Sequence, residues 1–361
     1  MMRPMRFDPI APVPIAAVLG LLLSACQGLG PGSVGRGRAA YNDVIAQTSS
    51  EQTLGVLVRI RYGDPIGLLS VSSVTASLKF GVRAGGEVGI GAKSGYAGNL
   101  VPFSGGIAYE DSPTISYVPV DAQAFLAEWL KPLPLDTVIL SARVAGRGSA
   151  LFALLVDRVN GLRSGGDASP AERAAFTRAI ALLDELLAVG VASWIPPAGP
   201  GRAYELVFSG YAPAHVAQVD ELLALLGAQA STRAGAEIRI PVVPRTGREA
   251  AAALAFETRS VGAIMRGAAE GIEVPAEHVE AGVVAPSRAS GDHDMLRIRS
   301  SVDAPSHPSV AVEHRGFWYY VDDTDLESKH IFQEIQILFM SALAQATAGS
   351  QSSPILTVPV K

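Results

Sequence analysis

Residues 74–96, which read VTASLKFGVRAGGEVGIGAKSGY, constrain the fold more than any other stretch of the chain. Their even-numbered positions are apolar or small and their odd-numbered positions are mostly polar or glycine, and this period of two predicts β-strands with one apolar face. A three-residue loop at residues 84–86 would place Val82 opposite Val88 and give both arms the same apolar face. We therefore expect a β-hairpin whose apolar face comprises Leu78, Phe80, Val82, Val88 and Ile90.

Each arm of this expected hairpin has about ten residues, the length of a tilted strand that crosses a bilayer. Two interpretations stay open. In the first, each copy of the protein is a channel subunit that donates the hairpin to a shared oligomeric barrel, a plan that resembles the lipoproteins of curli-type secretion channels. In the second, the hairpin covers the protein's own core with its apolar face, which is the commoner cause of such alternation in antiparallel sheets.

Further strands are predicted in short β-branched or alternating runs. A second hairpin is expected at residues 106–118, around Asp111-Ser112-Pro113, with Tyr109 opposite Ile115. Residues 151–159 fit a strand or a helix. Other strands, each bounded by glycine, proline or charge, are expected at residues 204–209, 237–243, 295–300, 310–321 and 355–360.

Capping residues mark several helix starts. Ser169-Pro170-Ala171-Glu172 is a capping box with proline at the first helical position, and Gly190 should end the helix that follows. Thr324-Asp325-Leu326-Glu327 predicts a second such start. Further helices are expected at residues 121–130, at residues 213–226, and at residues 42–61 with a break at Ser49-Ser50.

Helices and hairpins that interleave in this way predict an α+β fold, with a mixed and mostly antiparallel sheet and several packed amphipathic helices. The glycine-rich stretch at residues 163–168 is a candidate domain boundary. It would separate a hairpin-containing α/β region at residues 39–165 from a second α/β region at residues 166–361. A single domain that includes both regions is the alternative.

The first 26 residues have the order of a secretory signal. Arg3 and Arg6 precede an apolar run at residues 15–23, and small residues precede Cys26. The sequence Leu-Ser-Ala-Cys that ends at Cys26 resembles the lipobox of bacterial lipoproteins, which implies that residues 1–25 are cleaved and that the cysteine carries a lipid. We therefore expect a lipid-anchored protein whose first membrane contact is Cys26.

Cys26 is the only cysteine of the chain, so the mature protein would contain neither a disulfide nor a free thiol. The next residue is Gln27 rather than aspartate, which by the same resemblance implies the outer membrane of a Gram-negative cell, with the protein facing the periplasm. Residues 26–38 are rich in glycine and predict a flexible tether between the lipid and the folded part.

Composition and motifs exclude several functions. Hydrophobic residues make up 48% of the chain, enough for a core, and 29 basic against 34 acidic residues leave no basic field for nucleic acid. The sequence has no G-x-S-x-G, H-E-x-x-H or P-loop motif, and its histidines have irregular spacing, so we assign no cofactor and no metal and favour a non-enzymatic protein. The alternative is a periplasmic ligand-binding protein or hydrolase, whose pocket requires Arg259, Glu273, His278 and Asp322 to converge.

Longer blocks resemble an uncharacterised family of proteobacterial lipoproteins. They lie at residues 51–65, 113–119, 258–260, 271–278 and 315–329. The resemblance implies an envelope location and a globular mature part, and it carries no catalytic residue to this chain. We therefore expect an outer-membrane-anchored scaffold or subunit in envelope assembly or export, with other envelope proteins or further copies of itself as partners.

Overall fold

The computed structural model describes residues 31–67, 69–75, 78–86, 103–111, 114–144, 148–165, 168–199, 202–228, 235–245, 252–287, 296–348 and 356–359. These residues form an α+β fold in which most strand pairs are antiparallel, as the sequence predicts. The expected leader and Cys26 lie outside the described residues, and so do residues 26–30 of the expected tether.

The helices are α2 (Pro31–Tyr62), α3 (Ala122–Leu130), α4 (Leu135–Val144), α5 (Gly148–Leu155), α6 (Pro170–Ala188), α7 (Pro213–Leu225), α8 (Val261–Glu270), α9 (Ala276–Glu280) and α10 (Leu326–Ala348). The first strands along the chain are β1 (Leu69–Thr75), β2 (Leu78–Gly86), β3 (Phe103–Asp111) and β4 (Thr114–Pro119). They are followed by β5 (Val156–Val159), β6 (Leu162–Arg163), β7 (Ala192–Ile195), β8 (Tyr204–Phe208), β9 (Ile238–Pro244), β10 (Leu254–Thr258), β11 (Arg299–Ser301), β12 (Pro308–His314), β13 (Phe317–Asp322) and β14 (Leu356–Pro359).

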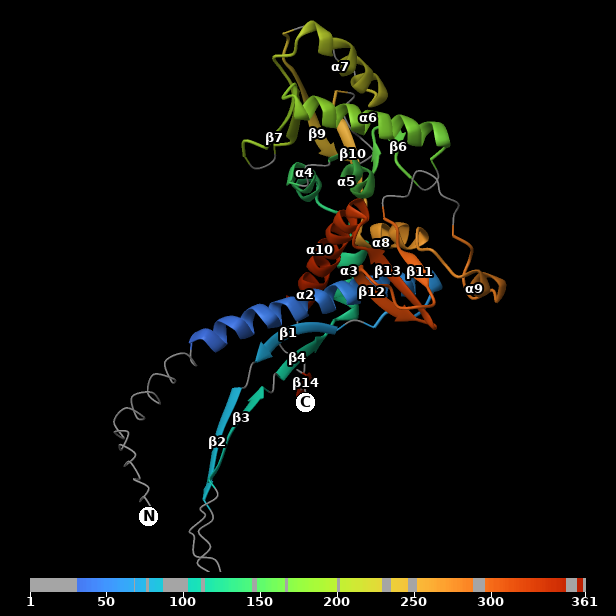
Figure 1. Ribbon diagram of the computed structural model, residues 1–361. Coiled ribbons are helices and arrows are strands. Elements are labelled where there is room, and N and C mark those ends of the chain that lie inside the picture. The colour runs from blue at the N-terminus through green and yellow to red at the C-terminus, as the bar shows by residue number, and fades with distance from the viewer. Residues whose placement is uncertain are drawn as a thin grey trace, which may run out of the picture.

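A six-stranded sheet in the order β6-β5-β10-β9-β8-β7 occupies the top of Figure 1, with α6 and α7 packed against it. Its pairs are antiparallel except β9 with β10. In β9, Ile238, Ile240 and Val242 are buried while Arg239 and Pro241 between them are exposed. This alternation follows from a sheet that has one face covered by helices and the other in water.

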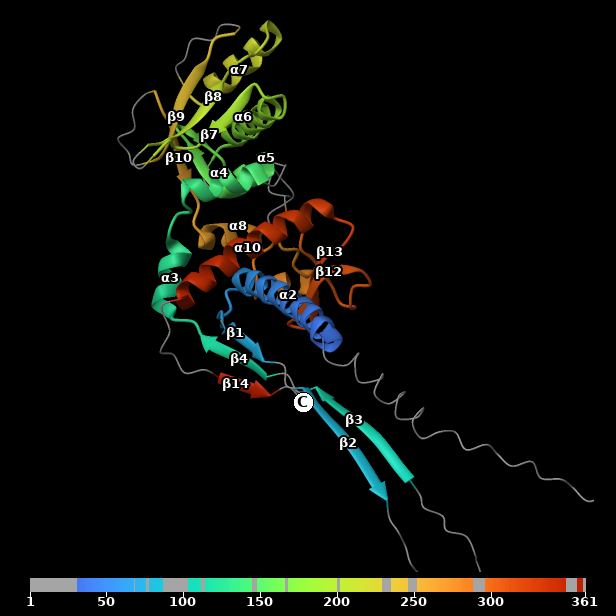
Figure 2. The same cartoon turned by 90° about the vertical axis from the view of Figure 1, so that its left-hand side faces the viewer.

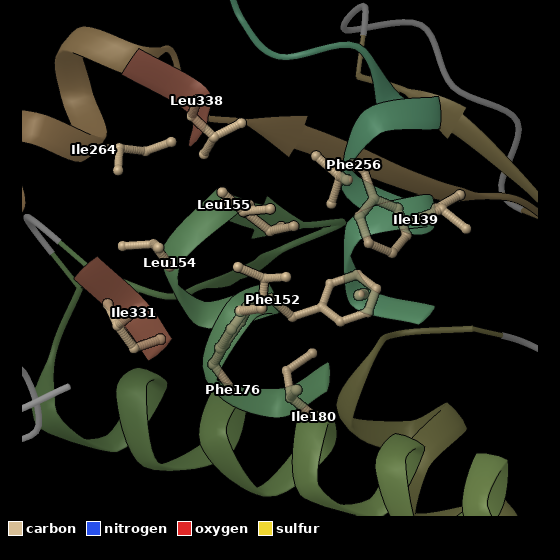
Figure 3. Packing of buried hydrophobic residues seen from close by; sticks show 14 of the residues in the cluster. Ile139, Phe152, Leu154, Leu155, Phe176, Ile180, Phe256, Ile264, Ile331 and Leu338 are labelled. Carbon is tan, nitrogen blue, oxygen red and sulfur yellow. The ribbon is translucent and has the colours of Figure 1, made fainter. Parts of the chain in front are cut away.

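Side chains of α5 connect this sheet to the helices below it. Figure 3 shows Phe152 beside Phe176 of α6, and its ring centroid lies 6.3 Å from that of Phe256 in β10. Leu154, two residues before β5 begins, lies on the side of Ile264 of α8 in the same view. All five side chains belong to one continuous hydrophobic cluster, so the sheet and the lower helices share a core.

The lower layer consists of α2, α3, α8 and α10 with the three-stranded sheet β11-β13-β12. The chain leaves this layer after α3 and returns to it before α8. At that crossing the Leu133 amide donates to the Arg259 carbonyl at 3.0 Å, and Thr258 Oγ1 donates to the Leu133 carbonyl at 2.6 Å. The six-stranded sheet with α4 to α7 is therefore an insertion in the lower layer.

The expected helix caps of α6 and α3 are confirmed. Ser169 Oγ accepts from the Glu172 amide at 3.2 Å, and Glu172 Oε2 accepts from the Ser169 amide at 2.8 Å, which is the reciprocal capping box. Asp121 caps α3 by accepting from the Ala124 amide at 2.8 Å. These bonds span three residues, so a local sequence pattern is enough to predict them.

Helix α2 differs from its expectation in where it begins and in being continuous. It begins at Pro31, inside the stretch expected as tether, and proline favours the first turn of a helix. The expected break at Ser49-Ser50 is wrong. The hydroxyls of these serines donate to the carbonyls of Ile45 and Ala46 one turn earlier, so they are satisfied inside a continuous helix.

Helix α10 is capped one residue later than its sequence suggests. Asp325 Oδ1, not the Thr324 hydroxyl, accepts from the Ser328 amide at 3.1 Å. Thr324 instead donates its amide and its hydroxyl to Asp322, at 2.9 and 2.6 Å. Thr324 is therefore bound within the tight turn between β13 and α10, and Asp325 caps the helix in its place.

The run at residues 310–321 is not one strand but the hairpin of β12 and β13, with Val312 opposite Tyr319. Arg315 and Gly316 at its turn have φ values of 53° and 82°. Positive φ at both central residues matches the right-handed twist of the flanking strands, and this is why a two-residue turn fits here.

Residues 151–159 contain both predicted structures, because α5 ends at Leu155 and β5 begins at Val156. The strands expected at residues 204–209, 237–243 and 355–360 correspond to β8, β9 and β14. The six-stranded sheet includes β5 and β6 from one side of residue 165 and β7 to β10 from the other, so the candidate domain boundary falls within one sheet.

Candidate functional site

Strands β1 to β4 form one long two-armed β-ribbon. β1 pairs with β4 and β2 pairs with β3 in a single antiparallel register that runs from Leu69 opposite Pro119 to Gly86 opposite Phe103, with one shift within β1. The two separate hairpins expected at residues 74–96 and 106–118 are therefore wrong. Tyr109, which was expected opposite Ile115, lies opposite Phe80.

The prediction of two separate hairpins is wrong because a period of two determines which face of the sheet a residue lies on but does not determine its partner strand. Residues 84–86, expected as a loop, belong to β2 and pair with residues 103–105. Val82 lies opposite Ile107, so β-branched residues still meet across the strands. Any partner strand of the right parity satisfies the alternation, and the partner in the structure is β3, which begins 17 residues after β2 ends. Val88 and Ile90 lie outside the described residues.

The register assigns the positions of β2 and β3 to two faces. The apolar face comprises Leu78, Phe80, Val82, Ala84 and Gly86 with Phe103, Gly105, Ile107, Tyr109 and Asp111. The polar face comprises Lys79, Gly81, Arg83 and Gly85 with Ser104, Gly106, Ala108 and Glu110. Leu78, Phe80 and Val82 thus share one face, as expected, although their partner strand is different.

Strands β2 and β3 leave both of their outer edges open among the described residues. They form a two-stranded sheet, whereas β14 covers the outer edge of β4. Figures 1 and 2 show this part of the ribbon extending away from the helices. A two-stranded sheet is marginally stable in water, and five glycines in its eighteen residues weaken it further. Open edges of this kind are templates for pairing with another chain.

A cluster of polar and aromatic side chains lies at the base of the ribbon. We call it the base cluster, and it comprises Tyr62, Asp64, His278, His314, Arg315 and Tyr319. Tyr62 is the last residue of α2, Asp64 follows it, and β1 begins five residues later at Leu69. The other members come from α9 and from the β12–β13 hairpin. The base cluster therefore ties the start of the ribbon to the lower layer.

Asp64 binds a guanidinium and an imidazole. Arg315 Nη2 donates to Asp64 Oδ1 at 2.7 Å, and His314 Nε2 lies 2.9 Å from Asp64 Oδ2. The hydrogen bond from Arg315 lowers the pKa of Asp64, and burial lowers the pKa of His314. At neutral pH the charge pair is therefore Asp64 with Arg315, while a neutral His314 donates its Nε2 proton to the carboxylate.

Tyr62 connects the rest of the base cluster. Its hydroxyl lies 2.5 Å from the Tyr319 hydroxyl and 2.7 Å from His278 Nδ1. The Arg315 guanidinium lies over the Tyr62 ring, 5.3 Å from its centroid. Tyr319 is fully buried, and burial together with the hydrogen bond from Tyr62 raises the pKa of its phenol. The hydroxyl of Tyr62 thus joins three elements, because its partners lie in β13 and α9.

Three of the sequence blocks that resemble lipoproteins converge on the base cluster. Tyr62 and Asp64 lie in the block at residues 51–65, His278 ends the block at 271–278, and Arg315 and Tyr319 lie in the block at 315–329. Of this group, the sequence pattern indicates His278 as a pocket residue and includes His314 only among the histidines of irregular spacing. The blocks themselves were the available signal, because they are far apart in the chain and meet only in the fold.

Arg259, Glu273, His278 and Asp322, the four residues of the expected ligand pocket, each bind a different set of partners. Arg259 pairs with Asp157 and donates to Ser164 Oγ at the crossing to the six-stranded sheet. Glu273 accepts a hydrogen bond from the Ser300 amide, and Asp322 accepts one from the Thr324 hydroxyl. His278 is hydrogen-bonded to the Tyr62 hydroxyl.

Among the described side chains, no group of three or more His, Cys, Asp or Glu residues is placed to hold a metal ion. No helix in the described ranges is both long enough and apolar enough to span a bilayer. Comparisons with protein-family models, with curated proteins and with solved structures found no match. The ribbon with its base cluster is therefore the candidate site that the chain's own geometry offers.

Proposed function

We propose that this protein is a subunit of an oligomeric envelope channel, in which the β2–β3 part of the ribbon from each copy pairs edge to edge with those of its neighbours. The observation that carries the proposal is a projecting two-stranded ribbon with one apolar face and, among the residues that the structure describes, two open edges. Because β2 and β3 are antiparallel, β3 of one copy next to β2 of the following copy continues the same pattern. A closed ring of copies would leave no edge open.

The dimensions of the ribbon fit a bilayer. β2 and β3 pair over nine residues each, close to the length of about 9–11 residues with which a tilted strand crosses the hydrocarbon core. In a barrel formed by a ring of such ribbons, the apolar face would contact lipid and the polar face would line the interior. The aromatic residues Phe80, Phe103 and Tyr109 occupy register positions of the apolar face. The polar alternation on the other face is the pattern that a water-filled interior requires.

A lipid at Cys26 would support the same orientation. Cys26 precedes the first residue of α2 by five positions. Figures 1 and 2 show that the N-terminal end of α2 and the ribbon both point away from the six-stranded sheet. The lipid and the ribbon would then reach the same membrane from the same side. By resemblance to lipoproteins with glutamine after the cysteine, this membrane is the outer membrane, approached from the periplasm.

The test is the mass of the full, detergent-extracted protein by light scattering, beside a variant that lacks residues 78–111. In that variant residues 76, 77, 112 and 113 remain as a four-residue turn between β1 and β4, a common hairpin length. We expect a large closed oligomer for the whole chain and a folded monomer for the variant. A whole chain that is monomeric or dimeric, with the same mass per copy after the deletion, overturns the proposal.

A matched pair of substitutions separates lipid contact from general damage to the ribbon. Val82→Lys places a charge on the apolar face and should cost about 2–4 kcal/mol if that face meets the bilayer midplane. Ala108→Lys places the same charge on the polar face and should be tolerated. Flotation of the two variants with liposomes gives the comparison. Equal membrane integration of both variants would contradict a lipid-facing apolar face.

A further inference from the structure

We infer that the polar face of the ribbon lines an anion-selective interior, and that Arg83 is the residue that sets the selectivity. The inference rests on the proposed ring of ribbons and deepens it, because it names the class of solute. The solutes are anions that a guanidinium recognises, such as chloride, carboxylates and phosphates.

The polar face has more positively charged than negatively charged residues. Lys79 lies directly opposite Glu110 in the register, so residues of opposite charge occupy these two facing positions. Arg83 lies opposite Gly106. Within the described part of the ribbon, each copy therefore contributes one positive charge to this face beyond the Lys79–Glu110 pair.

The register neighbours of Arg83 on the polar face are all small and uncharged. They are Gly81 and Gly85 in β2 and Ser104, Gly106 and Ala108 in β3. Arg83 is therefore the largest residue at its level, and Glu110, the acidic residue of this face, lies four positions away across the register. In a ring of copies this level becomes a ring of arginines among small residues. Rings of arginine or lysine are how pores select anions and phosphate.

The test is the reversal potential of the full lipidated protein in a planar bilayer with a potassium chloride gradient. We expect a preference for chloride over potassium in the unmodified protein. Arg83→Gln should reduce that preference several-fold or reverse it, and Arg83→Lys should retain it. The matched control is the double variant Lys79→Gln with Glu110→Gln, which removes two charges without changing the net charge and should leave the preference unchanged. Light scattering of each variant checks that the oligomer is intact.

The outcomes separate this inference from the proposed function. A conducting oligomer that prefers cations, or one in which Arg83→Gln and the double variant behave alike, overturns the role of Arg83 and leaves the channel standing. An intact oligomer without conductance overturns the channel and the inference together. A chloride preference that falls with Arg83→Gln and returns with Arg83→Lys supports both.

Discussion

At the scale of single residues, the absence of a side chain at Gly262 permits α8 to pack closely against α3. A Cβ added at Gly262 of α8 would overlap the indole of Trp129 in α3, and both residues are buried. Trp129 is held in turn by Phe125 and Phe339, with ring centroids 5.3 and 6.4 Å away, so it has little room to move. We predict that Gly262→Ala destabilises the protein by about 1–3 kcal/mol through overpacking, measured by urea denaturation.

Gly267 provides the control within the same helix. It is exposed, and an added Cβ would meet nothing within 4 Å. Because alanine is the better helix former, Gly267→Ala should leave stability unchanged or raise it by up to about 1 kcal/mol. If both variants had the same stability as the unmodified protein, the close packing of α3 on α8 would be contradicted.

His314 makes the stability of the base cluster depend on pH. Burial lowers the pKa of His314 in the folded protein below its ordinary value of 6.5, although Asp64 opposes this shift. As the pH falls through that ordinary value, the unfolded chain therefore takes up a proton that the folded chain does not, and stability is lost. The charged groups that act on His314 are Asp64, Arg315 and Arg59. We predict a flatter stability profile between about pH 7 and pH 5 for His314→Gln than for the unmodified protein.

The measurement for His314 is the free energy of unfolding at each pH, with the difference between the two profiles as the readout. Other histidines contribute equally to both proteins and cancel in that difference. Profiles with identical slopes, or a steeper slope for His314→Gln, would show that the imidazole does not titrate at a lowered pKa.

At the scale of elements, the register of the ribbon differs from the register that the sequence predicts, and pairs of cysteines can distinguish the two. We predict that Val82→Cys with Ile107→Cys, which lie opposite each other, forms an intrachain disulfide under mild oxidation. Val82→Cys with Val88→Cys, which would pair around a loop at residues 84–86, should not. Cys26, the only natural cysteine, is replaced by serine in both variants, so that a chain without lipid contributes no other thiol. Peptide mapping under non-reducing conditions identifies the bond.

The opposite result, a disulfide in the Val82/Val88 pair and not in the Val82/Ile107 pair, would restore the short hairpin. The proposed ring of ribbons would then lose the long arm on which it depends. A comparison at several protein concentrations separates bonds within one chain from bonds between neighbouring copies.

At the scale of the whole molecule, the ribbon and the six-stranded sheet lie at opposite ends, with the lower layer between them (Figure 2). The base cluster joins the ribbon to the lower layer, and Arg259 with Asp157 joins that layer to the inserted sheet. In the proposed assembly the sheet would therefore extend away from the membrane. Its exposed face carries the Arg239–Glu205 and Arg245–Glu257 ion pairs, which suit a surface in water.

The sequence by itself determined the features whose physics is local. The capping box at Ser169 and the cap at Asp121 use bonds between residues three apart, so the pattern contains both partners. Alternation placed Leu78, Phe80 and Val82 on one face because the pleat depends only on the chain itself. The α+β class follows from the same two periodicities.

Only the tertiary structure decided which segments meet. The partner of β2 is a strand that begins 17 residues after β2 ends, because alternation is equally satisfied by nearer and farther strands. The base cluster unites residues up to 257 positions apart, such as Tyr62 and Tyr319, and no spacing rule spans that distance. Contacts of this kind depend on how whole elements pack around a shared core, which is a property of the folded chain and not of any segment within it.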